Sequence, residues 1–229
     1  MNLIIREKIH NENNRDYIYE ILKQNILEFR LLPGDSISEN DLSTLFNLSR
    51  TPIREAFIKL SEDGLLNIYP QKGSFISYID LNSIHESLFI RKSLEISILK
   101  EAIANFTPEN IKELKKIIGF QKTLLSTQPS PSELFALDNK FHQVIFEACG
   151  KKNIWKFISS VSLNFSRIRF LSSTEKSVMK KIISQHESIL KIIETKDFDA
   201  IADLIDNHIS NFLDKIEFLK QKHPNYFKK

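Results

Sequence analysis

The chain has 229 residues, of which 41% are hydrophobic and 27% are charged, and its formal net charge is +3. This is the composition of a globular protein with one large or two smaller domains, and it excludes a disordered chain. The single cysteine, Cys149, excludes an internal disulfide scaffold and a multi-cysteine zinc site.

Polar first residues and the lack of a long apolar run lead us to expect neither a signal peptide nor a membrane span, and so a cytoplasmic protein.

Charge is unevenly distributed along the chain. Residues 1–80 contain 9 Lys and Arg and 12 Asp and Glu. Residues 81–229 contain 23 Lys and Arg and 17 Asp and Glu. The net charges of the two parts are therefore −3 and +6, so a DNA-binding surface in the first part must be a local patch.

Hydrophobic residues at helical spacing predict three helices in the first part of the chain. The first surrounds residues 17–26, the second spans about 39–46, and the third runs from about 50 to 63 after a tight turn. Ser49 is the expected N-cap of the third helix.

Two short strands are predicted next, at residues 65–69 and 74–78, on either side of a turn that contains Pro70 and Gly73. Helix, helix, tight turn, helix and β-hairpin in this order indicate a winged helix-turn-helix. We therefore predict that residues 1–79 form a DNA-binding domain of this type.

The third helix is the expected DNA-reading element. Arg50, Thr51 and Arg54 share one flank of its first turns, where guanidinium groups can pair with guanine or clamp phosphate. Lys72 and Gly73 lie at the hairpin tip, where a wing approaches the DNA backbone. Two arginines on a helix are more often a solvated face, but the ordered elements around them favour DNA recognition.

Residues 80–229 are predicted to form a second domain, an antiparallel all-helical bundle, so that the whole fold is mainly α. Long amphipathic segments with short breaks between them indicate about six helices. They are expected at about 81–104, from 107, at 130–150, at 153–171, from 173, and after Asp197.

Four polar residues lie where this bundle requires apolar core. Asp138 and His142 are four residues apart on the third bundle helix, and His186 and His208 lie on the apolar faces of two later helices. Such groups are costly to bury without partners. One divalent ion held by all four removes that cost, and three imidazoles with one carboxylate suit Zn²⁺, Ni²⁺, Fe²⁺ or Mn²⁺. Hydrogen-bonded structural histidines are the alternative, and the pattern leaves both interpretations open.

Five segments between residues 18 and 76 follow a known pattern. They are Leu32-Pro33-Gly34-Asp35, Ser38-Glu39-Asn40-Asp41-Leu42, Leu48-Ser49-Arg50-Thr51-Pro52-Ile53-Arg54-Glu55-Ala56, Asp63-Gly64-Leu65 and Lys72-Gly73-Ser74-Phe75. Together they resemble the winged-helix domain of GntR-family bacterial transcription regulators. The resemblance implies that Ser49, Arg50, Arg54 and Gly73 contact operator DNA. Asn40 departs from the pattern, since several family members have an arginine there.

The second part of the chain also resembles a family. Asp138 with His142, then His186, then His208 follow the order found in the effector domain of the FadR subfamily, the FCD domain. This resemblance implies that these four residues bind a metal. Residues 89–95 resemble the first helix of that domain, which implies that Arg91 faces the cavity of an effector.

We accordingly predict a transcription regulator rather than an enzyme. A homodimer is expected to bind a double-stranded, inverted-repeat DNA operator, and a small organic acid is expected to modulate that binding at the metal site. Two alternatives are a metal-dependent enzyme that uses the three histidines and the aspartate to activate water, and a regulator whose metal is purely structural. The sequence shows no obvious general base beside the site, which disfavours the enzyme.

Overall fold

The computed structural model describes residues 3–127, 130–210 and 212–228. The chain divides into two compact units, one of Met1–Leu81 with Lys220–Lys229 and the other of Asn82–Leu219. The sequence placed residues 220–229 with the helical domain, whereas their contacts join them to the N-terminal unit. No helix in the described part of the chain is long and apolar enough to cross a membrane.

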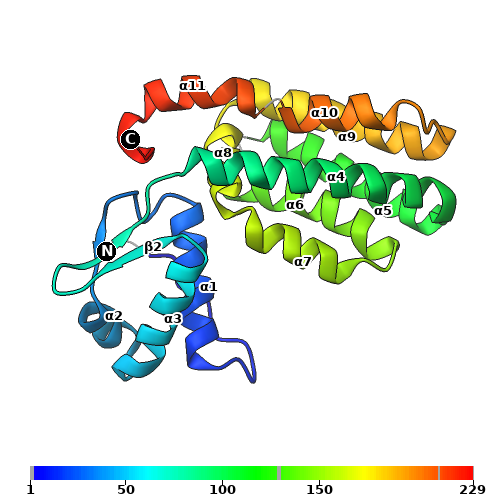
Figure 1. Cartoon of the computed structure of the whole chain (residues 1–229). Coiled ribbons are helices and arrows are strands. Elements are labelled where there is room, and N and C mark those ends of the chain that lie inside the picture. Colours follow the sequence, from blue (N-terminus) through cyan, green and yellow to red (C-terminus); the bar gives the residue numbers. More distant parts are fainter. Residues whose placement is uncertain (1–2, 128–129, 211, 229) are drawn as a thin grey trace. The chain divides into compact units, whose positions relative to one another are not determined.

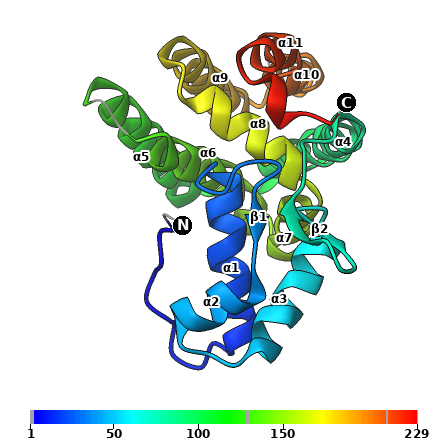
Figure 2. The ribbon, with the colours of Figure 1, turned by 90° about the vertical axis from the view of Figure 1, so that its left-hand side faces the viewer.

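The N-terminal unit is a winged helix-turn-helix (Figures 1 and 2). Its elements are α1 (Asn14–Leu27), β1 (Ser36–Ile37), α2 (Glu39–Phe46), α3 (Arg50–Glu62), β2 (Leu66–Tyr69) and β3 (Gly73–Ile76). The strands form an antiparallel sheet in the order β1-β3-β2, with Leu66 opposite Ile76. The hairpin of β2 and β3 was predicted, whereas the two-residue strand β1 was not.

Helices α1 and α3 pack against each other and supply much of this unit's core. Ile18 and Leu22 of α1 and Ile53 and Phe57 of α3 are fully buried. Their spacing of three or four residues places each pair on one face of its helix. Asn47, which ends α2, adopts a left-handed conformation that permits the tight turn into α3.

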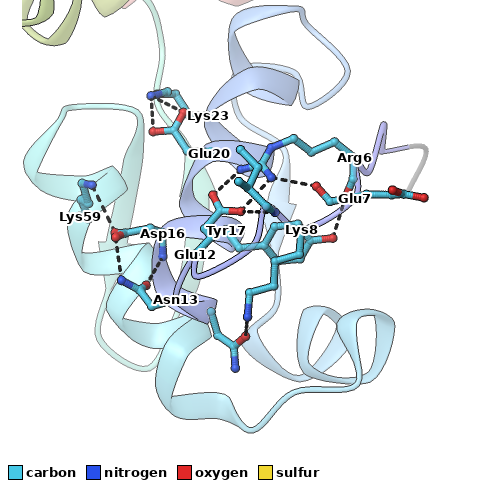
Figure 3. A network of polar contacts seen from close by, with 12 residues as sticks. Arg6, Glu7, Lys8, Glu12, Asn13, Asp16, Tyr17, Glu20, Lys23 and Lys59 are labelled. Carbon is cyan, nitrogen blue, oxygen red and sulfur yellow. Dashed lines mark hydrogen bonds and ion pairs between the residues drawn. The ribbon is translucent and has the colours of Figure 1, made fainter.

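An N-terminal arm is fixed to α1 by polar contacts. The buried side chain of Asn25 accepts a hydrogen bond from the Ile4 amide and donates one to the Ile4 carbonyl, both at 2.9 Å. Farther along, Arg6 forms an ion pair with Glu12, and the Tyr17 hydroxyl donates to the Arg6 carbonyl at 2.8 Å (Figure 3). These bonds satisfy backbone groups of an arm that has no regular secondary structure.

The C-terminal tail is fixed to the same unit. The Ile79 amide donates to the Tyr226 carbonyl at 2.8 Å, and the Lys228 amide donates to the Ile79 carbonyl at 3.0 Å. These bonds place Phe227 beside Ile79 in a parallel bridge, and Phe227 is buried. The Tyr226 ring stacks on Phe29 with 5.2 Å between ring centroids. Phe227 is therefore part of the core of the N-terminal unit.

Eight helices and one 3₁₀ turn follow the wing in the described residues. They are α4 (Leu81–Asn105), α5 (Pro108–Ser126), α6 (Pro131–Ala148), α7 (Lys152–Val161), α8 (Leu163–Ser173), α9 (Lys176–Thr195), α10 (Ile201–Ser210), α11 (Leu213–Lys222) and the turn Pro224–Tyr226. Helix α5 packs against α6 and α9, α6 against α7 and α8, and α9 against α8 and α10. The long helices lie side by side in Figure 1, and several are seen end-on in Figure 2. The predicted helical bundle is confirmed.

Helix starts agree with the sequence where a capping residue marks them. Thr107 and Ser130 form capping boxes before Pro108 and Pro131. The expected single helix at 153–171 is instead two helices that meet at Ser162, and the expected last helix is divided into α10 and α11. The count of six was therefore too low, because hydrophobic periodicity continues across these breaks.

Candidate DNA interface and metal centre

The start of α3 presents the residues predicted to read DNA. Ser49, Arg50, Thr51 and Arg54 are all exposed. Ser49 is the N-cap in backbone conformation, but its side chain makes no capping hydrogen bond. Its hydroxyl and the free amides of the first turn are therefore available to a phosphate.

The two arginines of this surface are not neutralised within the chain. In the part of the chain that the structure describes, neither Arg50 nor Arg54 forms an ion pair, whereas Arg15 on α1 is paired with Asp16 at 2.9 Å. Unpaired guanidinium groups keep all their donors for bases or phosphates. Asn40 is exposed near the start of α2, where a shorter, uncharged side chain replaces an arginine of the family pattern.

The tip of the wing carries the other two predicted DNA contacts. Both are exposed: Lys72 lies in the turn between β2 and β3, and Gly73 is the first residue of β3. Gly73 has a φ of 106°, a left-handed conformation that a side chain would strain. A glycine is thus required at this position by the hairpin itself, independently of any contact with DNA.

Three of the four predicted metal ligands meet inside the helical unit. His142 from α6, His186 from α9 and His208 from α10 are buried, and one ring nitrogen of each lies within 4.8 Å of the others. Residues far apart in the sequence therefore form one cluster, as their placement on apolar faces predicted.

Each histidine has its Nδ1 atom next to a side-chain oxygen. The partners are Glu95 for His142 at 3.3 Å, Gln121 for His186 at 3.0 Å and Gln185 for His208 at 3.1 Å. Because these oxygens only accept, the Nδ1 atoms carry the protons and the Nε2 atoms carry lone pairs. Burial lowers the pKa of His186 and holds that of His208 well below its usual range, so both rings are neutral at pH 7.

The lone pairs of these rings converge on one point. His142 Nε2 lies 3.2 Å from His208 Nε2, and His186 Nε2 lies 3.3 Å from Oδ1 of Asp138. Because the Nδ1 atoms carry the protons, the His142–His208 contact and the His186–Asp138 contact each bring two hydrogen-bond acceptors together. Among the described residues, His186 Nε2 and Asp138 Oδ1 are buried without a hydrogen-bond partner. A cation bound to all four atoms satisfies them, so these residues fit a divalent metal ion.

Asp138 has a second partner. Its Oδ2 atom forms a buried ion pair with the guanidinium of Arg169 from α8. Burial opposes ionisation of this carboxyl, but the guanidinium of Arg169 holds its pKa well below the usual range. Asp138 is therefore a carboxylate with one oxygen on Arg169 and the other facing the histidines.

Arg91, the predicted effector contact, is buried on α4 and forms an ion pair with Glu95 one turn later. Glu95 also contacts Nδ1 of His142, so Arg91, Glu95 and His142 form a continuous chain of polar contacts. Burial opposes ionisation of Glu95, but Arg91 and His142 lower its pKa. The cavity beside His142 measures about 10 Å³, which is room for one water molecule at most.

Both units match known families. Residues 14–76 match the model of bacterial regulatory proteins of the gntR family, and residues 86–211, more than half of the chain, match the FCD domain. The chain belongs to the GntR family of regulators, with an FCD domain. The predicted fold and the predicted family are therefore confirmed for this GntR regulator.

Relatives extend along almost the whole chain. The transcriptional repressor RspR of Escherichia coli K12 is 29% identical over 210 residues, 92% of this chain and of that protein. The Nta operon transcriptional regulator of Aminobacter aminovorans is 27% identical and covers 83% of this chain and 88% of its own length. These relatives are transcription regulators, which confirms that this GntR protein is a regulator and not an enzyme.

Solved structures support the fold. Escherichia coli McbR/YncC superposes with a TM-score of 0.73 at 17% identity, over 93% of this chain and 99% of that one. A putative GntR regulator from Rhodococcus sp. RHA1 gives 0.70 at 18% identity, over 87% and 97%. Likeness at these identities concerns the fold of this regulator alone.

Four polar residues around the histidines were missed by the sequence analysis. They are Glu95, Gln121, Gln185 and Arg169. A signal existed for some of them, because Glu95 and Gln121 interrupt apolar faces on α4 and α5 as the histidines do on later helices. What the sequence lacks is the pairing, which depends on how neighbouring helices pack.

Proposed function

We propose that this protein is a ligand-responsive transcription regulator that acts in the cytoplasm. A homodimer binds an inverted-repeat operator, and a small organic acid bound at a metal centre in the FCD domain modulates that binding. A repressor role is proposed because the RspR relative is named a repressor.

The proposal for DNA rests mainly on the unpaired, exposed arginines Arg50 and Arg54 at the start of α3. Together with Thr51 they offer guanidinium and hydroxyl donors in the part of a recognition helix that enters the major groove. Ser49, Lys72 and Gly73 are proposed to position the domain on phosphates.

Gel-shift measurements test this directly. An operator is first selected from random DNA with the wild-type protein. We expect Arg50→Ala and Arg54→Ala each to abolish specific binding. Arg15→Ala removes the same charge from a paired arginine on α1 and should leave specific binding nearly unchanged. Wild-type affinity in both α3 variants would overturn the assignment.

The homodimer is proposed to form through the helical unit. Phe89 on α4 is 75% exposed, the largest exposed fraction among the large hydrophobic side chains of the described residues, and we place it in the proposed interface. A two-fold dimer then presents two recognition helices to successive major grooves, which requires an inverted repeat. Sedimentation of wild type and Phe89→Ser tests this. A monomeric wild type at micromolar concentration contradicts the dimer.

The metal centre is proposed to consist of Asp138, His142, His186 and His208. When bound, a Zn²⁺, Ni²⁺, Fe²⁺ or Mn²⁺ ion supplies positive charge and open coordination positions that accept carboxylate oxygens. Arg91 is proposed to support an anionic effector near this centre.

Metal analysis of protein purified without a histidine tag decides whether an ion is bound. Thermal unfolding with a panel of organic acids, with and without added metal, then distinguishes a sensing role of the metal from a purely structural one. An acid that raises the melting temperature only with metal present supports sensing. Stabilisation by metal with no response to any acid favours a structural ion.

A further inference from the structure

A groove lies at the end of the helical unit where α4 connects to α5 and where α9 ends (Figure 1). Its volume is about 690 Å³, within the roughly 300–1,000 Å³ that ligand pockets occupy. None of the residues that line it belongs to the proposed metal centre or to the polar partners of the histidines. The groove is therefore a second candidate site, with a chemistry of its own.

The groove exists because three helix ends meet there. Helix α4 ends at Asn105, and Thr107 caps α5 only two residues later, so the connection is too short to cover the helix ends. Helix α9 packs against α5 and ends at Thr195. Lys196 follows with a φ of 56°, a left-handed conformation that turns the chain out of the helix.

The lining of the groove is largely aliphatic. Ile103 of α4 and Ile193 of α9 are nearly buried there, and Phe106 and Ile111 are half-buried beside them. An apolar molecule that covers these side chains removes its own surface and theirs from water, which favours binding. The groove is thus suited to an aliphatic chain, whereas a small hydrated ion would leave this lining unused.

The charged residues of the lining make the groove positive. They are Lys112, Lys115, Glu194 and Lys196. Lys115 of α5 is paired with Glu194 of α9 at 2.7 Å, so these two charges compensate each other. In residues 3–127, 130–210 and 212–228, neither Lys112 nor Lys196 forms an ion pair, and both are exposed. A carboxylate is complementary to these two ammonium groups.

We propose that this groove binds an amphipathic carboxylate, a molecule with an aliphatic chain and one carboxylate at its end. The chain covers Ile103, Ile111 and Ile193, and the carboxylate pairs with Lys112 and Lys196. The site is separate from the metal centre and needs no metal ion. It therefore goes beyond the proposed function and does not depend on it.

The test is the binding of decanoate to the full-length protein, measured by titration calorimetry below the concentration at which micelles form and with a metal chelator present. Wild type is compared with a groove variant, Lys112→Glu with Lys196→Glu, and with a control variant, Lys116→Glu with Lys191→Glu. The control changes one exposed lysine of α5 and one of α9 that do not line the groove. Both variants therefore alter the net charge equally.

The control variant should bind decanoate within about threefold of wild type. The groove variant should bind it at least roughly tenfold less tightly, because two carboxylates that repel the ligand replace two ammonium groups that attract it. Decanol has the same chain without the charge and should bind equally to wild type and groove variant. Equal losses of decanoate binding in both variants would indicate a general charge effect and overturn the site.

Wild type alone keeps the inference testable if the groove variant does not fold. Decanoate should bind roughly tenfold more tightly than octanoate, because each buried methylene strengthens binding by a factor of about four at most. Inorganic phosphate should not compete with decanoate. Equal affinities for the two chains, competition by phosphate, or no binding of decanoate each overturn the proposal. Failure of the metal centre leaves these results unchanged, because a chelator is present in every measurement.

Discussion

At the scale of single residues, the metal centre depends on how its imidazole rings are fixed. Each ring has one nitrogen bonded to a side chain from another position and the other directed at the centre. This fixes both the tautomer and the orientation of the ring before any ion arrives. Glu95, Gln121 and Gln185 are therefore positioning residues, which do not touch the ion themselves.

The glutamines allow this role to be tested without removing a ligand. Gln185→Ala frees the ring of His208, and we expect the Zn²⁺ affinity to fall by roughly 10- to 100-fold. Gln185→Glu keeps an acceptor at the same position and should restore most of the affinity. Gln143→Ala is the control, since Gln143 on α6 bonds Glu147 and no histidine. Wild-type Zn²⁺ affinity in Gln185→Ala would show that the bond does not position the ring.

Sequence reasoning found the histidines because each violates the apolar pattern of its own helix, which is a local property. It did not find Arg169 on Asp138, because that pair joins α8 to α6 and depends on the break at Ser162 that the sequence did not indicate. It placed Arg91 near the site without its partner Glu95. The pairing of side chains from different helices is fixed by how the helices pack, and it cannot be read from the hydrophobic pattern of each helix alone.

At the scale of elements, α1 holds the N-terminal arm through one buried amide. Asn25 is fully buried and bonds three backbone groups, two of Ile4 and one of Ile21. Its amide thus replaces the hydrogen bonds that a neighbouring strand would supply to the arm. Pattern analysis treats an asparagine on a helix as surface, so this contact was not predicted.

We expect Asn25→Ala to release the arm. Loss of the amide leaves backbone groups near Ile4 and Ile21 without partners and lowers the free energy of unfolding by roughly 1–3 kcal/mol. Hydrogen exchange of the Ile4 amide, together with denaturant unfolding, measures both effects. Gln24→Ala changes the preceding residue, whose side chain bonds Glu28 on the surface, and should change neither the exchange at Ile4 nor the stability. Unaltered exchange at Ile4 in Asn25→Ala would contradict the role of this amide.

Elements with local signals were predicted well, and elements without them were not. Thr107 and Ser130 mark helix starts because a capping residue precedes a proline. The break at Ser162 has neither glycine nor proline beside it, and β1 is only two residues long. Strand β1 exists because β3 pairs with it, which is a tertiary cause.

At the scale of the whole molecule, the chain leaves the winged-helix unit after Leu81 and returns to it at Lys220. The returning segment follows α11 and ends against Ile79, just before the point where the chain first leaves the unit. The winged-helix unit is thus covalently connected to the FCD domain at both ends of that domain.

The tail should therefore stabilise the winged-helix unit without contributing to the metal centre. Phe227→Ala removes a side chain that is 5% exposed, and we expect it to lower the free energy of unfolding by roughly 3 kcal/mol. Its Zn²⁺ affinity should equal that of wild type, because all proposed ligands lie in the other unit. Lys228→Ala removes only an exposed ion pair with Asp80 and should change stability by less than about 1 kcal/mol. Thermal unfolding and competition for Zn²⁺ with a chelating dye measure both quantities, and a Phe227→Ala protein that melts like wild type would show that the tail is not part of this core.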